Sequence, residues 1–178
     1  MSGLDTEYTA FFEELLCRDG ETLANYAHFF DFRPAHVKRA EFNRSRKKLL
    51  SYLIKRDGWL CQLGLIDERN LAAGCQVDHL IPLSTNVLNI KIKKTRPAPG
   101  RKVASESFGS NDPDNLVIAC KFCNGRKKHN FLKTSEMHRI LCLRNSASRF
   151  YKNSMGTAGQ FPVSPAALCN LSMAKRVA

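Results

Sequence analysis

The sequence contains no long apolar run, since no hydrophobic stretch reaches the roughly 18 residues that a membrane-spanning helix needs. Its opening residues, MSGLDTEYTAFFEELL, lack the basic region that begins a secretory signal. From these two absences we expect a cytoplasmic protein without a membrane partner. The chain has 178 residues, of which 43% are hydrophobic and 25% charged. That length suits a globular domain with a sizeable core and appended segments.

Basic residues are nearly missing from the start of the chain, and acidic residues are few in the rest. Residues 1–31 hold one base and seven acids, which gives them a net charge of −6. Because the whole chain has a net charge of +12, residues 32–178 carry +18. Such a distribution favours a polyanionic partner for the basic part, and nucleic acid is the usual one. A surface that merely keeps the protein soluble is the alternative interpretation.

Apolar spacing and helix-capping residues predict mainly helices. Two short helices are expected at residues 5–18 and 21–30, and a long helix is expected over residues 34–56, followed by Asp57-Gly58. A further helix is expected from residue 134 to about 152, followed by a loosely held tail. The long helix is expected to expose a basic face. This face comprises Lys38, Arg39, Arg44, Arg46, Lys47 and Lys48.

Two short strands are expected on either side of a long basic connection. The first is CQVDHLIPLS (75–84), closed by Pro82, and the second is NLVIAC (115–120). The connection, residues 86–112, is rich in Pro, Gly, Lys and Arg, and loops of this length are usually functional or disordered. A helix is expected to begin within NGRKKHNFL (124–132) and to pack against the strands.

Four pieces of the sequence, in this order, resemble the HNH, or ββα-metal, endonuclease family. They are RDGWLCQL (56–63), VDHLIPLS (77–84), DPDNLVIAC (112–120) and CNGRKK (123–128). The resemblance covers about half of the chain. It implies an α+β fold, in which a small ββα-metal core of a two-stranded hairpin and a helix is surrounded by N- and C-terminal helices.

Together with the charge pattern, the resemblance suggests three segments. Residues 1–33 form an acidic helical segment. Residues 34–133 would form the HNH nuclease domain, including its preceding basic helix and the basic loop 86–112. Residues 134–178 form a C-terminal helix and a flexible tail.

The resemblance also implies a role for each matching residue. His79 would be the general base, since an imidazole with a pKa of about 6.5 accepts a proton near neutral pH. Asp78 would bind one Mg²⁺ or Mn²⁺ through a carboxylate oxygen, and Asn124 would supply a second, neutral oxygen. Many family members have histidine in place of Asn124, whereas asparagine, as in the RNA-guided CRISPR nucleases, favours these harder metals. Asn115 would brace the loop that carries His79, and Lys127 would contact a phosphate.

Seven cysteines in a chain without a secretory signal indicate metal ligands and buried thiols before disulfides. Family members often carry two CxxC knuckles that together hold a structural Zn²⁺. The second knuckle is present as Cys120-Lys-Phe-Cys123, but the first is reduced to Cys61. Cys75 is the nearest replacement ligand in the sequence and Cys17 is a remote one. Alternatively, the thiols are simply buried, and packing takes the place of the metal.

Basic residues of the long helix and the loop could line a groove for double-stranded DNA. The candidates are Arg44, Lys47, Lys48, Lys93, Lys94, Arg96 and Arg101. Their phosphate contacts would give affinity and register without sequence discrimination. The acidic N-terminal helices have three interpretations: a dimerisation element, a shield over the groove, or a solvated cap on the core. A homodimer would matter because a single HNH site cuts one strand.

These inferences favour a metal-dependent HNH endonuclease that hydrolyses DNA, of the restriction or phage-defence type. Taken singly, Asp78-His79 could be a surface pair and Asn115 a turn residue, but their combination with the other pieces indicates an active site. A phage-borne or homing endonuclease that nicks DNA is a close alternative. The alternative from another class is a zinc-containing module that binds nucleic acid without catalysis. Such a module would place no demand on His79 or Asn124.

Overall fold

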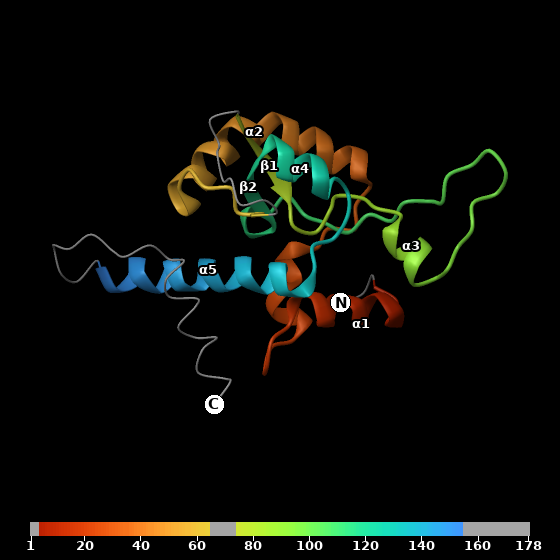
Figure 1. Ribbon diagram of the computed structural model, residues 1–178, viewed down its shortest axis with the longest axis horizontal. Coiled ribbons are helices and arrows are strands. Elements are labelled where there is room, and N and C mark those ends of the chain that lie inside the picture. The colour runs from red at the N-terminus through yellow and green to blue at the C-terminus, as the bar shows by residue number, and fades with distance from the viewer. Residues whose placement is uncertain (1–3, 65–73, 155–178) are drawn as a thin grey trace.

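The computed structural model describes residues 4–64 and 74–154, with side chains described as far as Arg144. Within these ranges the protein is α+β. A two-stranded antiparallel hairpin packs with helices, and the N- and C-terminal helices contact each other (Figure 1). The predicted fold class is therefore confirmed. The predicted tail, residues 155–178, lies outside the described residues.

The hairpin consists of β1 (Cys75–His79) and β2 (Leu116–Cys120), with Cys75 opposite Cys120 and His79 opposite Leu116. All five residues of β2 are buried. The predicted first strand was too long, because β1 ends at His79. Beyond this point the backbone N–H groups of Leu80 and Ile81 donate to Asn115 instead of to a partner strand.

The long helix, α2 (Ala35–Asp57), begins after Pro34 and ends at Gly58, close to the predicted bounds. Gly58 has a φ of 72°, in the left-handed region that favours glycine. Leu53 of this helix is fully buried and belongs to the hydrophobic core.

Lys38 corrects the predicted exposed face of α2, because it is fully buried. Its ammonium donates to the backbone oxygen of Asp31 and, at 2.7 Å, to that of Gly109. Asp31, just before α2, and Gly109, in a segment that runs beside the first turn of α2, offer these carbonyl acceptors, and no local pattern in the sequence predicts them. Burial lowers the pKa of Lys38 to about 8.

The other helices are α1 (Thr6–Leu16), η1 (Leu23–Phe29), α3 (Val87–Lys91), η2 (Pro113–Asn115), α4 (Lys121–Lys127) and α5 (Thr134–Ser154). α4 starts directly after β2, earlier than predicted, because the Cys120 sulfur caps it by accepting from the Cys123 N–H. α3 falls within the connection that was predicted to be irregular. It is held there by Asn89, which bonds to the Tyr8 hydroxyl of α1.

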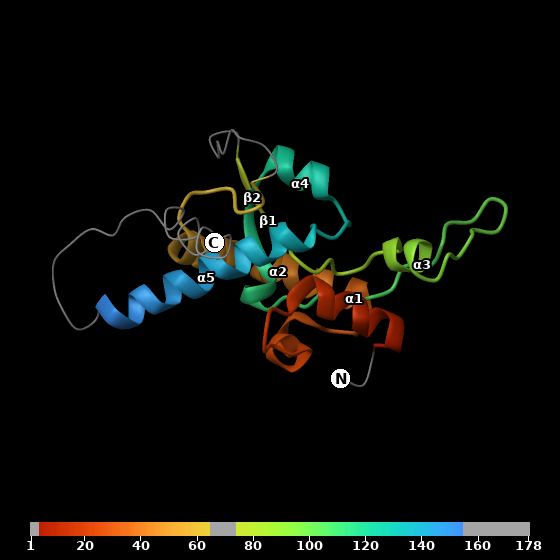
Figure 2. The same ribbon diagram turned by 60° about the horizontal axis from the view of Figure 1, so that its bottom comes forward.

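Helices α2 and α4 both contact the hairpin, while α1 and α5 pack together beneath it (Figures 1 and 2). One hydrophobic core extends through all these elements. Phe12 of α1 is fully buried and makes edge-to-face contacts with Phe30, Phe108 and Phe131. The acidic N-terminal helix therefore covers part of the core. None of the helices in the described ranges is both long and apolar enough to cross a membrane.

Candidate active site

Asp78 and Asn124 lie along one seam, where α4 packs on β1. Alternate residues of a strand share a face, and helix residues three apart share a side. Gln76 and Asp78 therefore face α4, while Asn124 and Lys127 face β1. Asn124 Nδ2 donates to Gln76 Oε1 at 2.5 Å, and Lys127 Nζ lies 3.0 Å from Asp78 Oδ2. The two predicted metal ligands thus come from neighbouring positions of two facing elements.

Lys127 is buried in this seam, with a side chain only 1% exposed, although the sequence suggested a phosphate contact. Its ammonium donates to the backbone oxygen of His79 at 2.6 Å and forms the ion pair with Asp78. Burial lowers the pKa of Lys127, and the Asp78 carboxylate opposes this effect. Asp78 Oδ2 is buried, and the Lys127 ammonium is the cation beside it. The seam therefore contains a buried anionic oxygen that needs a cation beside it.

The donor set of the seam fits a divalent metal ion that prefers oxygen ligands. Carboxylate and amide oxygens are the ligands that Mg²⁺ and Mn²⁺ favour. Because Nδ2 of Asn124 is engaged by Gln76, the carbonyl oxygen is the atom that Asn124 offers to a ligand. Asp78 would contribute its buried Oδ2, and the ammonium of Lys127 would then have to leave this oxygen.

His79 ends β1 and lies on the opposite side of the strand from Asp78. Its ring packs against Phe42 of α2, with 4.9 Å between the ring centroids, and its Nε2 is 3.0 Å from Asn111 Oδ1. The residue is 8% exposed. Burial lowers the pKa of His79 to about 4. The imidazole is consequently neutral at neutral pH, as a general base must be.

Asn115 holds the backbone that follows His79. Its side chain is fully buried, and Oδ1 accepts from the Ile81 N–H at 2.8 Å. Nδ2 donates to the backbone oxygens of Ile81, at 3.0 Å, and of Ser110, at 2.8 Å. All of these are contacts to backbone, so Asn115 joins the end of β1 to the segment before η2.

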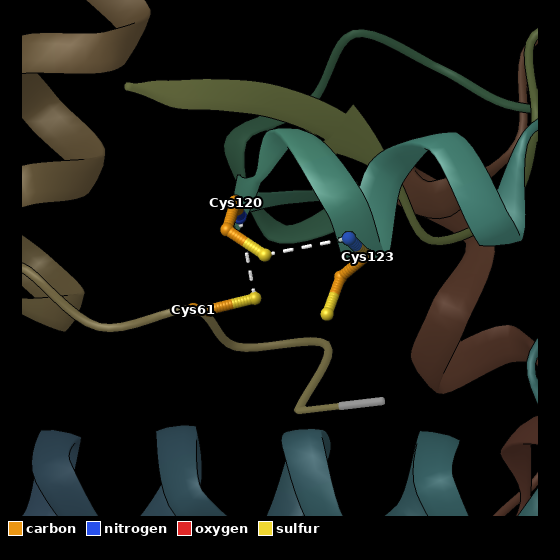
Figure 3. Close-up of side chains that lie close together, drawn as sticks. All are labelled: Cys61, Cys120 and Cys123. Atoms are coloured by element: carbon orange, nitrogen blue, oxygen red, sulfur yellow. Dashed lines mark hydrogen bonds between the residues drawn. The ribbon is translucent and has the colours of Figure 1, made fainter. Parts of the chain in front are cut away.

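Cys61, Cys120 and Cys123 form a buried cluster at the other end of the hairpin (Figure 3), with all three sulfur atoms within 4.8 Å of one another. The backbone N–H of Cys120 donates to the Cys61 sulfur at 3.3 Å, and that of Cys123 donates to the Cys120 sulfur at 3.3 Å. Burial opposes ionisation of Cys120, yet hydrogen bonds from Cys123 and Cys61 bring its pKa below the ordinary value. The cluster could hold a metal ion such as zinc.

Cys75 is not part of this cluster, although its backbone pairs with that of Cys120 across the hairpin. Cys17, at the end of α1, does not belong to it either. In residues 4–64 and 74–144, no fourth histidine, cysteine or acidic side chain lies within the same distance of all three sulfur atoms. The geometry thus gives three ligands, and neither candidate replacement for the missing cysteine joins them.

The predicted DNA-binding residues are exposed, with the exception of Lys127. Lys93 is exposed but engaged, since its ammonium lies 2.7 Å from Asp5 Oδ2 and 4.3 Å from the centre of the Tyr8 ring. The segment after α3, which carries Lys94, Arg96 and Arg101, extends away from the rest of the chain in both views (Figures 1 and 2). Its basic side chains are therefore open to a polyanion.

A second group of potential ligands, His28, Asp112 and Asp114, lies on the surface near η2. Within this group, Asp114 lies 3.6 Å from His28 Nε2 and 3.3 Å from Arg56 Nη1. Asp112 caps η2 by accepting from the Asp114 N–H. We assign this group a structural role in ending the connection to β2.

Two residues of the site were not identified from the sequence. Gln76 could have been found, because it lies two positions before Asp78 and a strand repeats every two residues. No pattern in the sequence predicts that Asn111 contacts His79, because this contact depends on the path of the loop along α2. Compared with known proteins, the chain matches no family model, no curated protein and no solved structure.

Proposed function

We propose that the protein is a metal-dependent endonuclease of the HNH type that hydrolyses phosphodiester bonds in DNA. The observation that carries the proposal is the seam between β1 and α4, where Asp78 and Asn124 offer oxygen ligands next to a strand that ends in His79. An antiparallel hairpin followed at once by a helix is the arrangement that the family resemblance implies. The charge of +18 after residue 31 supports a nucleic-acid substrate.

In the proposed reaction, His79 accepts the proton of the attacking water through its neutral imidazole. Asp78 and Asn124 would hold one Mg²⁺ or Mn²⁺, which when bound would stabilise charge on the phosphate and on the departing 3′ oxygen. Asn115 keeps the backbone after His79 in place, and Lys127 ties the His79 carbonyl to α4. Each of these side chains acts from a hairpin or helix position fixed by core packing.

We assign Cys61, Cys120 and Cys123 to a structural Zn²⁺. The support is their shared burial and the N–H···S hydrogen bonds, which favour thiolate ligands. This ion would secure the segment before β1 to the start of α4, and so hold Asn124, the residue after Cys123, in place.

The substrate in this proposal is double-stranded DNA, bound by the exposed bases of α2 and of the segment after α3. Because such contacts are mainly with phosphates, affinity should fall steeply with salt. We propose a role in restriction or phage defence for this activity. Cleavage of both strands would require two copies of the site, as in a homodimer.

The test is cleavage of supercoiled plasmid with Mg²⁺ or with EDTA, by the wild type and His79→Ala. We expect cleavage by the wild type with Mg²⁺ alone, and a rate about 100- to 10,000-fold lower for His79→Ala, the usual contribution of a general base. DNA binding in a gel-shift assay should persist in the variant. His129→Ala, which removes an exposed histidine just after α4, is the matched control.

If His79→Ala cuts as fast as the wild type, His79 is not the base. If the wild type binds DNA but cuts under no metal condition, the protein is instead a nucleic-acid-binding module.

A further inference from the structure

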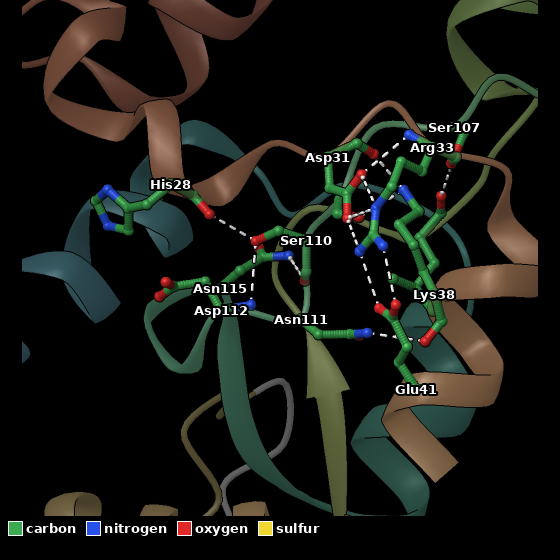
Figure 4. A network of polar contacts seen from close by, with 12 residues as sticks. His28, Asp31, Arg33, Lys38, Glu41, Ser107, Ser110, Asn111, Asp112 and Asn115 are labelled. Atoms are coloured by element: carbon green, nitrogen blue, oxygen red, sulfur yellow. Dashed lines mark hydrogen bonds and ion pairs between the residues drawn. The ribbon is translucent and has the colours of Figure 1, made fainter. Parts of the chain in front are cut away.

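Asn111 is held between α2 and the end of β1. Its Nδ2 donates to the backbone oxygen of Lys38 at 2.8 Å, as Figure 4 shows, and its Oδ1 lies 3.0 Å from His79 Nε2. The amide therefore spans the distance from the first turn of α2 to the imidazole. Both of its ends are engaged, so the amide has one orientation.

The backbone that carries Asn111 is fixed just as closely. Gly109 donates its N–H to the Pro82 oxygen at 2.9 Å, and a Cβ atom at Gly109 would lie 2.0 Å from the Ile81 oxygen. Only glycine fits such a close approach. From the other side, the Lys38 ammonium donates to the Gly109 oxygen at 2.7 Å. The loop is thus pinned against both α2 and the residues that follow β1.

The chemistry of these groups fixes the direction of each hydrogen bond. The Lys38 carbonyl can only accept, so the Asn111 atom facing it must be the amide nitrogen. The atom facing His79 is consequently the amide oxygen, which also can only accept. His79 must therefore donate from Nε2. A neutral imidazole carries one proton on its two nitrogens, so its lone pair is on Nδ1.

We propose that Asn111 is a positioning residue that sets the tautomer of His79: it keeps the proton on Nε2 and presents Nδ1 as the basic nitrogen. The functional consequence rests on the proposed nuclease activity, because only a proton-accepting histidine needs a particular nitrogen free. The tautomer itself does not depend on that activity. Phe42 packs against the ring, so that Asn111 and Phe42 together fix both its rotation and its protonation pattern.

The direct test is nuclear magnetic resonance of the full chain labelled with ¹⁵N-histidine, at a pH where His79 is neutral. Long-range ¹H–¹⁵N correlations distinguish the two neutral tautomers, and the His79 signals are assigned by their loss in His79→Gln. We expect the Nε2–H pattern in the wild-type protein. A predominant Nδ1–H pattern would overturn the proposal without any variant of Asn111.

Two variants of Asn111 test its hydrogen-bond donor and its hydrogen-bond acceptor separately. Asn111→Asp retains an acceptor toward His79 but loses the donor to Lys38, whereas Asn111→Leu has nearly the same size and loses both. We expect Asn111→Asp to keep the Nε2–H pattern and Asn111→Leu to give a mixture of tautomers. The exposed Asn130→Leu is the matched control and should behave as the wild type.

Cleavage assays on the same variants distinguish this inference from the proposed function. If the protein is a nuclease, Asn111→Leu should lower kcat about tenfold or more while KM changes little, and Asn111→Asp should recover part of the loss. If Asn111→Leu changes the tautomer of His79 but the wild type cleaves no DNA, the positioning role stands and the nuclease proposal is rejected. The opposite result is that the wild type cleaves DNA while Asn111→Leu keeps the wild-type kcat and the wild-type tautomer of His79. That result would reject the positioning role and leave the nuclease proposal standing.

Discussion

The two ends of the β1–β2 hairpin are built from different kinds of buried groups. At the end where Cys75 pairs with Cys120, the cysteine cluster is compact, and its sulfur atoms accept backbone hydrogen bonds. At the end where His79 pairs with Leu116, the neighbouring Asp78 and Lys127 bury an ion pair.

The buried groups at the two ends of the hairpin differ in what they contribute to stability. A buried thiol costs little and can gain from a metal, whereas a buried ion pair loses much of its attraction to desolvation. An apolar pair would serve stability at least as well in place of Asp78 and Lys127. Titratable groups with shifted pKa values are typical of functional sites, and His79 and Lys127, whose pKa values are both lowered by burial, lie at the end with the oxygen ligands.

The largest effect on stability is expected at the cysteine end. Cys123→Ser should lower both the zinc content of the purified protein and its thermal midpoint, because a structural metal contributes directly to the free energy of folding. Atomic emission and calorimetry measure the two quantities. Cys75→Ser is the control, since Cys75 lies outside the cluster, and it should retain the metal. Equal zinc content in Cys123→Ser and the wild type would show that the cluster is not a zinc site.

A smaller loss is expected from breaking the ion pair between Asp78 and Lys127 at the other end of the hairpin. Lys127→Met leaves the buried Asp78 carboxylate without a cation and should lower the free energy of unfolding by about 3–5 kcal/mol in metal-free buffer. Under the proposed function, added Mg²⁺ should restore part of this loss, because it would bind the folded state beside the same carboxylate. Lys121→Met, at an exposed position of α4, should change stability by about 0.5 kcal/mol or less. If Lys127→Met is as stable as the wild type, the pair is not what holds this end together.

The smallest effect is expected from an ion pair away from both ends of the hairpin. Arg18 lowers the pKa of Glu21 to about 2, mainly through their hydrogen bond. The resulting stabilisation is fully present above the ordinary pKa of 4.5 and is lost as pH falls toward 2. Denaturant unfolding between pH 5 and about 2 should therefore show a weaker pH dependence in Glu21→Gln than in the wild type. An identical dependence would mean that Glu21 does not take part in acid unfolding.

The sequence predicted those features that depend on local pattern. The bounds of α2 follow from Pro34 and Gly58, and β2 follows from a short apolar run. Asp78 and Asn124 were placed in one site by the resemblance to HNH endonucleases, and both lie on the seam between β1 and α4.

Features that depend on the path of the long connection were not predictable. The burial of Lys38, the early end of β1 and the position of Asn111 all arise from residues 108–115 running beside α2 and β1. These contacts join positions far apart in the chain, and neither composition nor periodicity carries information about them. Residues 65–73, between Gly64 and Gly74, lie outside the described residues.

The most direct test of the central claim is Mn²⁺ binding, measured by electron paramagnetic resonance of the free ion, which needs no substrate. The account predicts one Mn²⁺ per wild-type chain, and at least tenfold weaker binding for both Asp78→Ala and Asn124→Ala. Asn130→Ala, an exposed asparagine after α4, should bind as the wild type does. If Asp78→Ala and Asn124→Ala bind Mn²⁺ as tightly as the wild type, the seam between β1 and α4 is not a metal site, and the proposed nuclease mechanism is wrong.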